Sequence, residues 1–344
     1  MNVQIHTFEL VIQLSSNAYR LLRNSFFEDA KGRKRWCYLN PGSSRIIYTR
    51  WKDIGLIIYL DCHCGESSAF YLHLRINPSK LLGNSDALAL FEPTEDSISE
   101  LIHQLQICLD SFPVELSVQQ ASLFRIDLCR NILVQSQEII YEYLRLLKRG
   151  AKRCNWEENL FYDGRDAHSF RRSNCRYQVT VYDKLYQIQE ENLTTLWDSP
   201  YKILRVEASL LSDGIRYVCR KHDFYDDNWT KCFCFLCSIR ELTMVEVLSK
   251  VISPGDYYSL QKAVCQLYES GKSYKKLDRL HSFLKDINRS KIVDVQAISN
   301  NREYINGKKR LRQLCRCNIN PVTIEARAGI DHLPSLLTAD DIIL

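Results

Sequence analysis

Four short segments place carboxylates, a histidine, a tyrosine and basic residues at alternate positions, with apolar residues between them. Successive side chains of a strand point to opposite faces, so this alternation predicts four strands with one apolar and one polar face each. If the strands share one sheet whose apolar face packs against helices, their polar side chains gather on the other face. The residues expected there are His73, Arg75, Arg125, Asp127, Tyr182, Lys184, Arg205 and Glu207.

These residue types are suited to cutting a phosphodiester bond. Carboxylate oxygens of Asp127 and Glu207 with an imidazole nitrogen of His73 would be ligands for Mg²⁺ or Mn²⁺. Such an ion polarises a phosphoryl oxygen and offsets the negative charge that develops during attack. Tyr182 is the candidate nucleophile, because a phenol with a pKa of about 10 becomes more reactive beside a cation such as Lys184 or a metal.

The same alternation also fits a sheet that simply exposes one face to water. Alternating polar residues are normal on such a sheet. Arginine and carboxylate side chains would then only support neighbouring strands through cross-strand pairs. The pattern by itself leaves both interpretations open.

The elements that would carry these residues lie before residue 212, where the hydrophobic pattern changes. Strand patterns there alternate with a few helices, which predicts an α+β fold with an antiparallel sheet and helices on one of its faces. The expected strands cover 5–13, 44–50, 55–61, 69–76, 122–129, 177–186 and 201–210, and the expected helices cover 15–24, 96–111 and 136–149.

After residue 212 the pattern is almost entirely helical. Apolar residues at i, i+3 and i+4 predict helices over 239–251, 256–270, 274–287 and 302–316, which Pro254-Gly255, Gly271 and Gly307 interrupt. The sequence therefore predicts a first domain at 1–212 that carries the chemistry and a helical accessory domain at 213–344.

Basic residues are concentrated near the end of the chain. The net charge of +5 is too small to indicate a nucleic-acid partner. Between Arg302 and Arg316, however, six Lys or Arg residues face the single acid Glu303. This cluster predicts contacts with phosphates, although a solvated helix face would have the same composition. The residues expected to make the contacts are Lys308, Lys309, Arg310 and Arg312.

The cysteines and the apolar runs indicate a cytoplasmic protein. The fourteen cysteines occur without a secretory signal, so they are interpreted as reduced, buried thiols rather than as disulfides. Neither the group at 232–237 nor Cys62-His63-Cys64 has the paired spacing of a structural zinc site. No apolar run approaches the roughly 18 residues of a membrane span, so we expect no membrane partner.

Four motifs resemble two families of replication proteins. The segments LHLRINPSKLLGNSD (72–86), LFRIDLCRNI (123–132), YQVTVYDKLYQI (177–188) and ILRVEASLL (203–211) are similar, in order and approximate spacing, to motifs of the gene II replication endonucleases of filamentous phages. They also resemble motifs of the plasmid trans-acting Rep family. The segment LRQLCRCNINPVTI (311–324) looks like the tail region of the phage group.

The resemblance implies roles for individual residues. Tyr182 and Lys184 match the Y-x-K strand that carries the catalytic tyrosine, and Asp127 and Glu207 match the carboxylates of the R-[IV]-D and R-[VF]-E strands. His73 stands where the phage proteins carry an acidic residue, so it would be a substituted metal ligand. The chain lacks the His-hydrophobe-His strand of the wider family, which predicts a carboxylate-rich metal site in an HUH-like Rep nuclease core.

The implied function is initiation of rolling-circle replication of a phage or plasmid in the cytoplasm of a bacterial host. Tyr182 would attack single-stranded origin DNA, retain a 5′-phosphotyrosine and free a 3′ hydroxyl. Tyr186, four strand residues away, would lie about 13 Å from Tyr182, too far to share its site. Arg75, Arg125 and Arg205 would contact the DNA.

The resemblance also implies partners for the protein, and two alternative functions stay open. The partners are origin DNA as a single strand or hairpin with flanking duplex, a second copy of the chain, and the host helicase and polymerase. The accessory domain would recognise the origin or dimerise. A relaxase or recombinase would use the same tyrosine chemistry. A non-catalytic nucleic-acid-binding module would instead use the sheet as a platform and expose aromatic residues on it.

Overall fold

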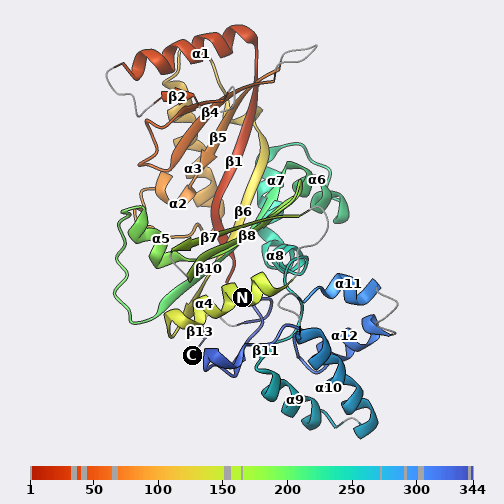
Figure 1. Cartoon of the computed structure of the whole chain (residues 1–344). Helices are drawn as coiled ribbons and strands as arrows, with labels where there is room; N and C mark the ends of the chain where they lie inside the picture. The colour runs from red at the N-terminus through yellow and green to blue at the C-terminus, as the bar shows by residue number, and fades with distance from the viewer. Residues whose placement is uncertain are drawn as a thin grey trace.

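A large antiparallel sheet forms the centre of the computed structural model (Figure 1). The structure describes residues 2–31, 37–39, 45–63, 69–150, 156–163, 166–271, 273–289, 293–300, 306–339 and 342–343. Its strands are β1 (Gln4–Leu14), β2 (Cys37–Leu39), β3 (Ile46–Tyr48), β4 (Leu56–His63), β5 (Ala69–Ile76), β6 (Ser122–Val134), β7 (Glu157–Asp163), β8 (Asp166–Ser173), β9 (Tyr177–Asp183) and β10 (Lys202–Leu211). They lie in the order β2-β3-β4-β5-β1-β6-β10-β9-β8-β7. A short strand near the C-terminus, β13 (Ile342–Ile343), pairs in parallel with β6.

The apolar face of the sheet is covered by helices. Phe26 of α1 (Ser16–Asp29) stacks on Tyr48 of β3 with ring centroids 4.2 Å apart. Phe8 of β1 lies 4.9 Å from Phe233 of α7 (Trp229–Ser238). Helix α4 (Gln137–Arg149) contacts β8 and β9. The predicted α+β fold class is therefore confirmed.

Helix α3 (Glu95–Asp110) illustrates how local sequence sets an element. Leu101, Leu105 and Leu109 recur every four residues and are all buried. Each fully buried leucine contributes roughly 1.5–3 kcal/mol by leaving water. Thr94 begins the helix, since its hydroxyl accepts a hydrogen bond from the Ser97 amide at 3.2 Å, which satisfies a free N–H of the first turn.

The first helices after residue 212 pack against the sheet, and the later helices lie beyond its end. Helices α6 (Ser212–Lys221), α7 and α8 (Arg240–Leu248) contact β6, β9 or β10. The indole of Trp229 donates to the Val118 carbonyl at 2.8 Å, which links α7 to the sheet domain. The change of pattern predicted near residue 212 thus coincides with the end of β10, but α6–α8 share the core of the sheet.

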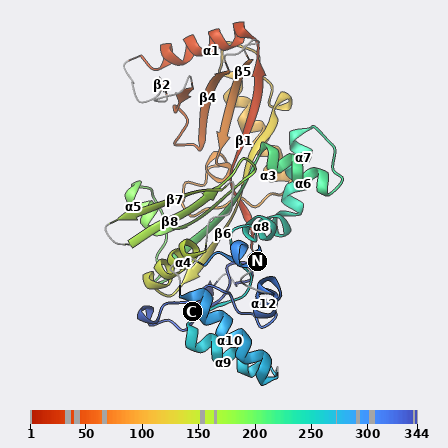
Figure 2. The same ribbon diagram turned by 45° about the vertical axis from the view of Figure 1, so that its right-hand side comes forward.

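The last helices form a lobe at the end of the sheet that carries α4 (Figures 1 and 2). They are α9 (Leu260–Glu269), α10 (Tyr274–Asn288), α11 (Val295–Asn300) and α12 (Gly307–Cys315). The segment after α12 returns to the sheet, where Arg130 of β6 donates to the Ala339 carbonyl at 2.9 Å. No helix in the described ranges is both long and apolar enough to cross a membrane.

Several elements differ from the predictions. The strand predicted over 177–186 ends at Asp183, where α5 (Lys184–Glu190) begins. The predicted helix 256–270 starts instead with the short strand β11 (Tyr257–Tyr258), and α9 follows. The β7–β8 hairpin was not predicted. Of the helix predicted over 302–316, residues 302–305 lie outside the described residues, and α12 begins at Gly307.

Candidate active site

The strand register places three of the predicted site residues on one face. Asp127 pairs with Ser209 across β6 and β10, and Glu207 of β10 stands two residues from Ser209. Tyr182 of β9 pairs with Arg205 of β10, which is again two residues from Glu207. Because side chains alternate along each strand, Asp127, Glu207 and Tyr182 point to the same side of the sheet.

A pocket of about 350 Å³ opens over this part of the sheet, and α5 contributes to its wall. Its volume is in the range of small-molecule sites. The pocket combines carboxylates, arginines, histidines and tyrosines, which are the groups that acid–base and phosphate chemistry require. Its lining includes His6, Arg75, Arg125, Asp127, His168, Arg171, Tyr182, Tyr186 and Glu207.

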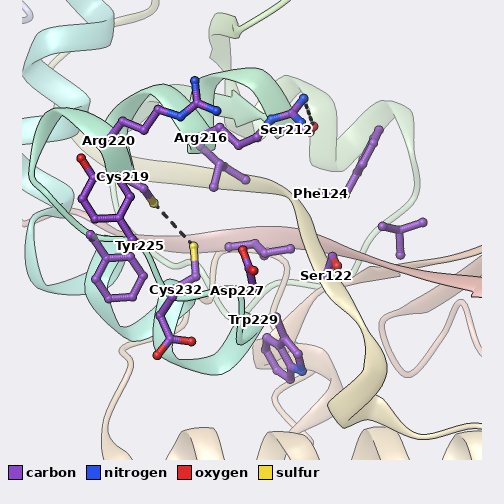
Figure 3. Close-up of a pocket in the computed structure, with 15 residues that line it drawn as sticks. Ser122, Phe124, Ser212, Arg216, Cys219, Arg220, Tyr225, Asp227, Trp229 and Cys232 are labelled. Atoms are coloured by element: carbon purple, nitrogen blue, oxygen red, sulfur yellow. Dashed lines mark hydrogen bonds between the residues drawn. The ribbon is translucent and has the colours of Figure 1, made fainter.

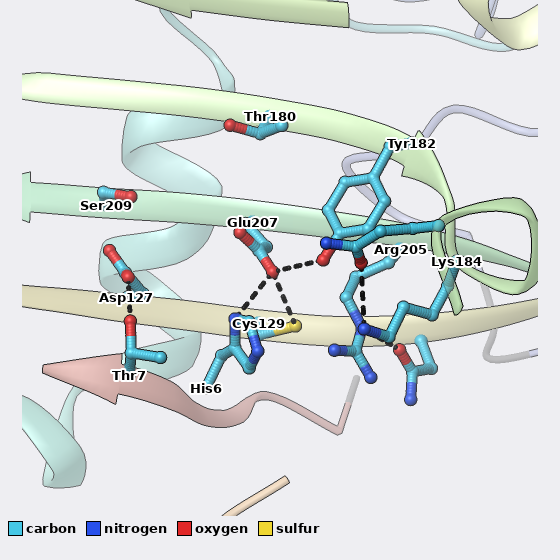
Figure 4. Close-up of polar contacts among 12 residues, drawn as sticks. His6, Thr7, Asp127, Cys129, Thr180, Tyr182, Lys184, Arg205, Glu207 and Ser209 are labelled. Atoms are coloured by element: carbon cyan, nitrogen blue, oxygen red, sulfur yellow. Dashed lines mark hydrogen bonds and ion pairs between the residues drawn. The ribbon is translucent and has the colours of Figure 1, made fainter. Parts of the chain in front are cut away.

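Glu207 connects the tyrosine to a histidine. The Tyr182 hydroxyl donates a hydrogen bond to Glu207 Oε1 at 2.8 Å. His6 Nδ1 lies 2.9 Å from the same oxygen. Figure 4 shows both contacts converging on Glu207, with the Cys129 sulfur at 4.0 Å. One carboxylate oxygen thus holds a potential nucleophile and a potential proton donor together.

The charges in this cluster shift both ionisable partners. Burial alone would raise the pKa of Glu207, but His6, Arg205 and the hydrogen bond from Tyr182 outweigh it and hold this pKa well below its usual value. Burial and the negative charge of Glu207 raise the pKa of the Tyr182 phenol well above 10. Tyr182 is therefore protonated at rest, and its reaction requires an acceptor for its proton.

His6 was missed by the analysis of the sequence because of an irregularity in β1. Regular alternation would place His6 with Phe8 and Leu10, which are buried in the core. The register of β1 against β6 shifts between Ile5 and Thr7, so His6 is the extra residue of a β-bulge. The bulge lets His6 reach Glu207 while Thr7 donates to Asp127. Hydrophobic periodicity does not indicate where such a bulge occurs.

Lys184 does not lie on the strand as predicted. It is the first residue of α5, its side chain is only 3% exposed, and its Nζ donates to Gln187 Oε1 at 2.9 Å. Burial and the charge of Arg205 lower the pKa of Lys184 to about 8. The change from strand to helix follows from Asp183, whose side chain accepts the Tyr186 amide at 3.0 Å and caps α5.

The same turn brings Tyr186 back to the pocket. The prediction placed it farther along a continuous strand, about 13 Å from Tyr182. Helix α5 instead folds it over the pocket, where its ring stacks on His168 with centroids 3.6 Å apart. Tyr182 and Tyr186 therefore line one pocket, and the continuous strand on which the predicted separation rested ends at Asp183.

His73 is not brought together with the two carboxylates. Its Nδ1 lies 2.7 Å from Glu9 Oε1. Strand β1 is inserted between β5 and β6, so His73 and Asp127 are two strands apart, roughly 9–10 Å before any displacement along the strands. Both Asp127 oxygens have partners, since Arg125 Nε donates to one at 2.7 Å and Thr7 to the other.

The predicted metal-ligand set His73, Asp127 and Glu207 is therefore not assembled. Among the residues that the structure describes, no three His, Cys, Asp or Glu side chains are placed to hold a metal ion together. The residues present thus do not form the three-ligand site that the sequence predicted.

The predicted DNA-contacting arginines fall into two groups. Arg75 and Arg125 line the pocket, and Arg125 also donates to Ser209 at 3.1 Å. Arg205 is 0% exposed and donates to Asn131 at 2.7 Å and to the Leu88 carbonyl at 3.1 Å. Contrary to the prediction, Arg205 lies below the surface, where its charge acts on Glu207 rather than directly on a ligand.

The basic residues predicted near the C-terminus lie on α12. Lys308, Lys309 and Arg312 are exposed there. Arg310 is partly buried over the ring of Phe283 of α10, 5.4 Å from its centroid. The first three are placed to meet a partner, whereas Arg310 also packs between two helices.

Comparisons with protein families and with curated proteins found no match. No protein-family model matches the chain, and no curated protein matches its sequence significantly. The resemblance to the phage and plasmid families therefore stays an interpretation of the motifs.

Proposed function

We propose that this chain cuts and rejoins single-stranded DNA through a phosphotyrosine intermediate, as an initiator of rolling-circle replication. The observation that carries the proposal is the hydrogen bond between Tyr182 and Glu207 in a pocket that also contains arginines. A hydroxyl bonded to a carboxylate is placed to pass its proton to that carboxylate as it attacks. Arg75 and Arg125 at the same pocket would attract a phosphate.

The proposed reaction is a transesterification whose proton transfers pass through Glu207. As the Tyr182 oxygen forms a bond to phosphorus, the phenol proton passes to Glu207. The bond from phosphorus to the 3′ oxygen breaks, and His6, which contacts the same carboxylate oxygen, supplies a proton to the leaving oxygen. The products are a 5′-phosphotyrosine and a 3′ hydroxyl. Reversal of these steps by another 3′ hydroxyl would rejoin the strand.

Positive charge near the pocket would favour the reaction despite the high pKa of Tyr182. In the protein alone, Glu207 is a weak base and the phenol is a weak acid. Arg75 and Arg125, which line the pocket, would stabilise a bound phosphate and the charge that develops on it. Origin DNA, a second copy of the chain, and a host helicase and polymerase are the partners that this function requires, in the cytoplasm of a bacterial host.

Replacing Tyr182 by phenylalanine tests the nucleophile. Tyr182→Phe removes one oxygen, so stability should fall by only about 1 kcal/mol, the contribution of one hydrogen bond. Cleavage of a labelled single-stranded origin oligonucleotide should be lost. Wild-type protein should form a denaturant-resistant adduct with the labelled strand, and variant Tyr182→Phe should form none.

Peptide mapping distinguishes the neighbouring tyrosines. Trypsin places Tyr182, together with Tyr177, in residues 177–184 and Tyr186, together with Tyr201, in residues 185–202, so fragmentation of the peptide and the tyrosine variants assign the adduct within each peptide. Tyr177→Phe and Tyr186→Phe serve as matched controls, and the adduct should persist in both. An adduct on residues 185–202 would move the chemistry to Tyr186. If no adduct forms and Tyr182→Phe still cleaves, water is the nucleophile and the proposal fails.

Metal dependence remains a separate prediction from the sequence. Because the three predicted ligands are not assembled, the proposed proton transfers are assigned to side chains alone. Mg²⁺ is often bound by one or two carboxylates together with substrate phosphates, so we still expect cleavage to require Mg²⁺ or Mn²⁺ and to stop in excess chelator. Full activity in chelator would refute the metal prediction and leave the role of Tyr182 intact.

A further inference from the structure

A pair of thiols lies in a second pocket, apart from the candidate active site. Cys219 of α6 and Cys232 of α7 have their sulfur atoms 3.7 Å apart. Both line a pocket of about 650 Å³ that shares no lining residue with the pocket of Tyr182. Figure 3 shows the two side chains pointing toward each other from separate helices.

We propose that Cys219 and Cys232 are a site of reversible disulfide formation by small-molecule disulfides such as oxidised glutathione. A disulfide bond is about 2.05 Å long, so the sulfur atoms must approach by roughly 1.6 Å. Each side chain is 8% exposed and faces a pocket. A small disulfide could therefore reach the pair without unfolding of the core.

The exchange proceeds in two balanced steps. The contact between the two sulfur atoms lowers the pKa of Cys219 and raises that of Cys232, so we take Cys219, after loss of its proton to water, as the attacking thiolate. It attacks one sulfur of oxidised glutathione, forms a mixed disulfide and releases one glutathione thiolate. Cys232 then loses its proton to water and attacks the Cys219 sulfur, which releases the second glutathione. Two protein thiols are oxidised, and one glutathione disulfide is reduced to two glutathiones.

The bond would join α6 to α7 and enclose the segment between them. That segment includes Tyr225 and Asp227, which line the same pocket. Oxidation would therefore restrict one wall of the pocket. Cys234 on α7 is exposed and does not line this pocket, so it provides a matched control on the same helix.

The full-length protein, titrated with oxidised glutathione and then alkylated under native conditions, tests this proposal. Trypsin should yield residues 217–220 linked to residues 232–240, with a mass lower by two hydrogens than the sum of the two peptides in which exposed Cys234 is alkylated; because residues 232–240 also contain Cys234 and Cys237, fragmentation of the linked peptide should place the bond on Cys232. Dithiothreitol should remove the link. Cys219→Ala and Cys232→Ala should each abolish it, whereas Cys234→Ala should leave its yield unchanged.

Three results would overturn the proposal, two of them in the wild-type protein. In one, Cys219 and Cys232 stay fully alkylated across the titration while Cys234 reacts. In the other, each carries glutathione and no link forms between them. Both readouts use the wild-type protein, so they hold even if an alanine variant folds poorly. A link through Cys234 that disappears in Cys234→Ala would likewise refute the assignment.

Discussion

At the residue scale, the candidate site depends on how burial and charge act on three groups. Glu207 is buried, yet nearby positive charges keep its carboxylate ionised. Burial, and after it the charge of the same carboxylate, keep Tyr182 protonated. Burial destabilises the charged form of Lys184, since it is the largest cause of the lowered pKa of this residue. Perturbed groups of this kind gather at functional sites more often than elsewhere.

Lys184→Met removes the buried ammonium group and should therefore change how the free energy of unfolding depends on pH. The folded pKa is about 8 against 10.5 for an ordinary lysine, so the unfolded chain binds more protons between these values. Wild-type stability should therefore rise as pH increases from 8 to 10.5. At pH 7 the variant should be more stable by up to about 3 kcal/mol, and this advantage should shrink toward pH 10.5.

Urea unfolding of both proteins at several pH values measures the difference. Lys309→Met, at an exposed position of α12, is the control and should show no such dependence. A constant difference between Lys184→Met and wild type from pH 7 to pH 10.5 would show that Lys184 has an ordinary pKa.

At the element scale, two local departures from regular structure build the pocket. The bulge in β1 turns His6 toward Glu207. The start of α5 after Asp183 places Lys184 and Tyr186 beside the sheet rather than along it. Asp183 stabilises this turn through two hydrogen bonds, since it accepts one from the Tyr186 amide and another from the Gln137 side chain at 2.6 Å.

Asp183→Ala should loosen α5 and reduce cleavage. Loss of the helix cap should cost about 1–2 kcal/mol of stability. Thr94→Ala removes the cap of α3 and should cost a similar amount while leaving cleavage unchanged, since α3 does not line the pocket. Thermal unfolding and oligonucleotide cleavage of both variants make the comparison. Equal cleavage by the two variants would show that α5 has no role in the reaction.

At the scale of the whole molecule, the candidate site and the basic helix α12 belong to different parts of the structure. The site lies over β9 and β10, and α12 lies in the lobe of the last helices (Figure 2). The two parts are tied together where α4 meets the C-terminal segment, for instance by the Tyr143 hydroxyl and the Pro334 carbonyl at 2.8 Å. Such an arrangement suits a protein that binds duplex DNA at one place and cuts a single strand at another.

Neutralising α12 should therefore separate binding from cleavage. Lys308→Gln, Lys309→Gln and Arg312→Gln together should weaken binding to duplex origin DNA and reduce the salt slope by about 0.9 for each lost phosphate contact. Cleavage of a pre-melted oligonucleotide should persist. The control combines Lys221→Gln and Lys231→Gln, whose side chains are already paired with Glu246 and Asp226. An unchanged slope in the α12 variant would assign these residues to solubility.

The sequence by itself determined the fold class and the faces of the central strands. Alternation with a period of two is a local property, so it identified β5, β6 and β10 and placed Asp127 and Glu207 on the polar side. The hydrophobic pattern over 96–111 likewise predicted the helix that the structure shows as α3. These predictions held because neighbouring residues alone set the period.

Only the tertiary structure decided which polar residues meet. The insertion of β1 between β5 and β6 separates His73 from Asp127, and the bulge in β1 supplies His6 instead. The contact between Cys219 and Cys232 likewise depends on how α6 and α7 pack. Strand order, bulges and helix packing are set by contacts between distant segments. The local hydrophobic periodicity of the sequence therefore does not indicate them.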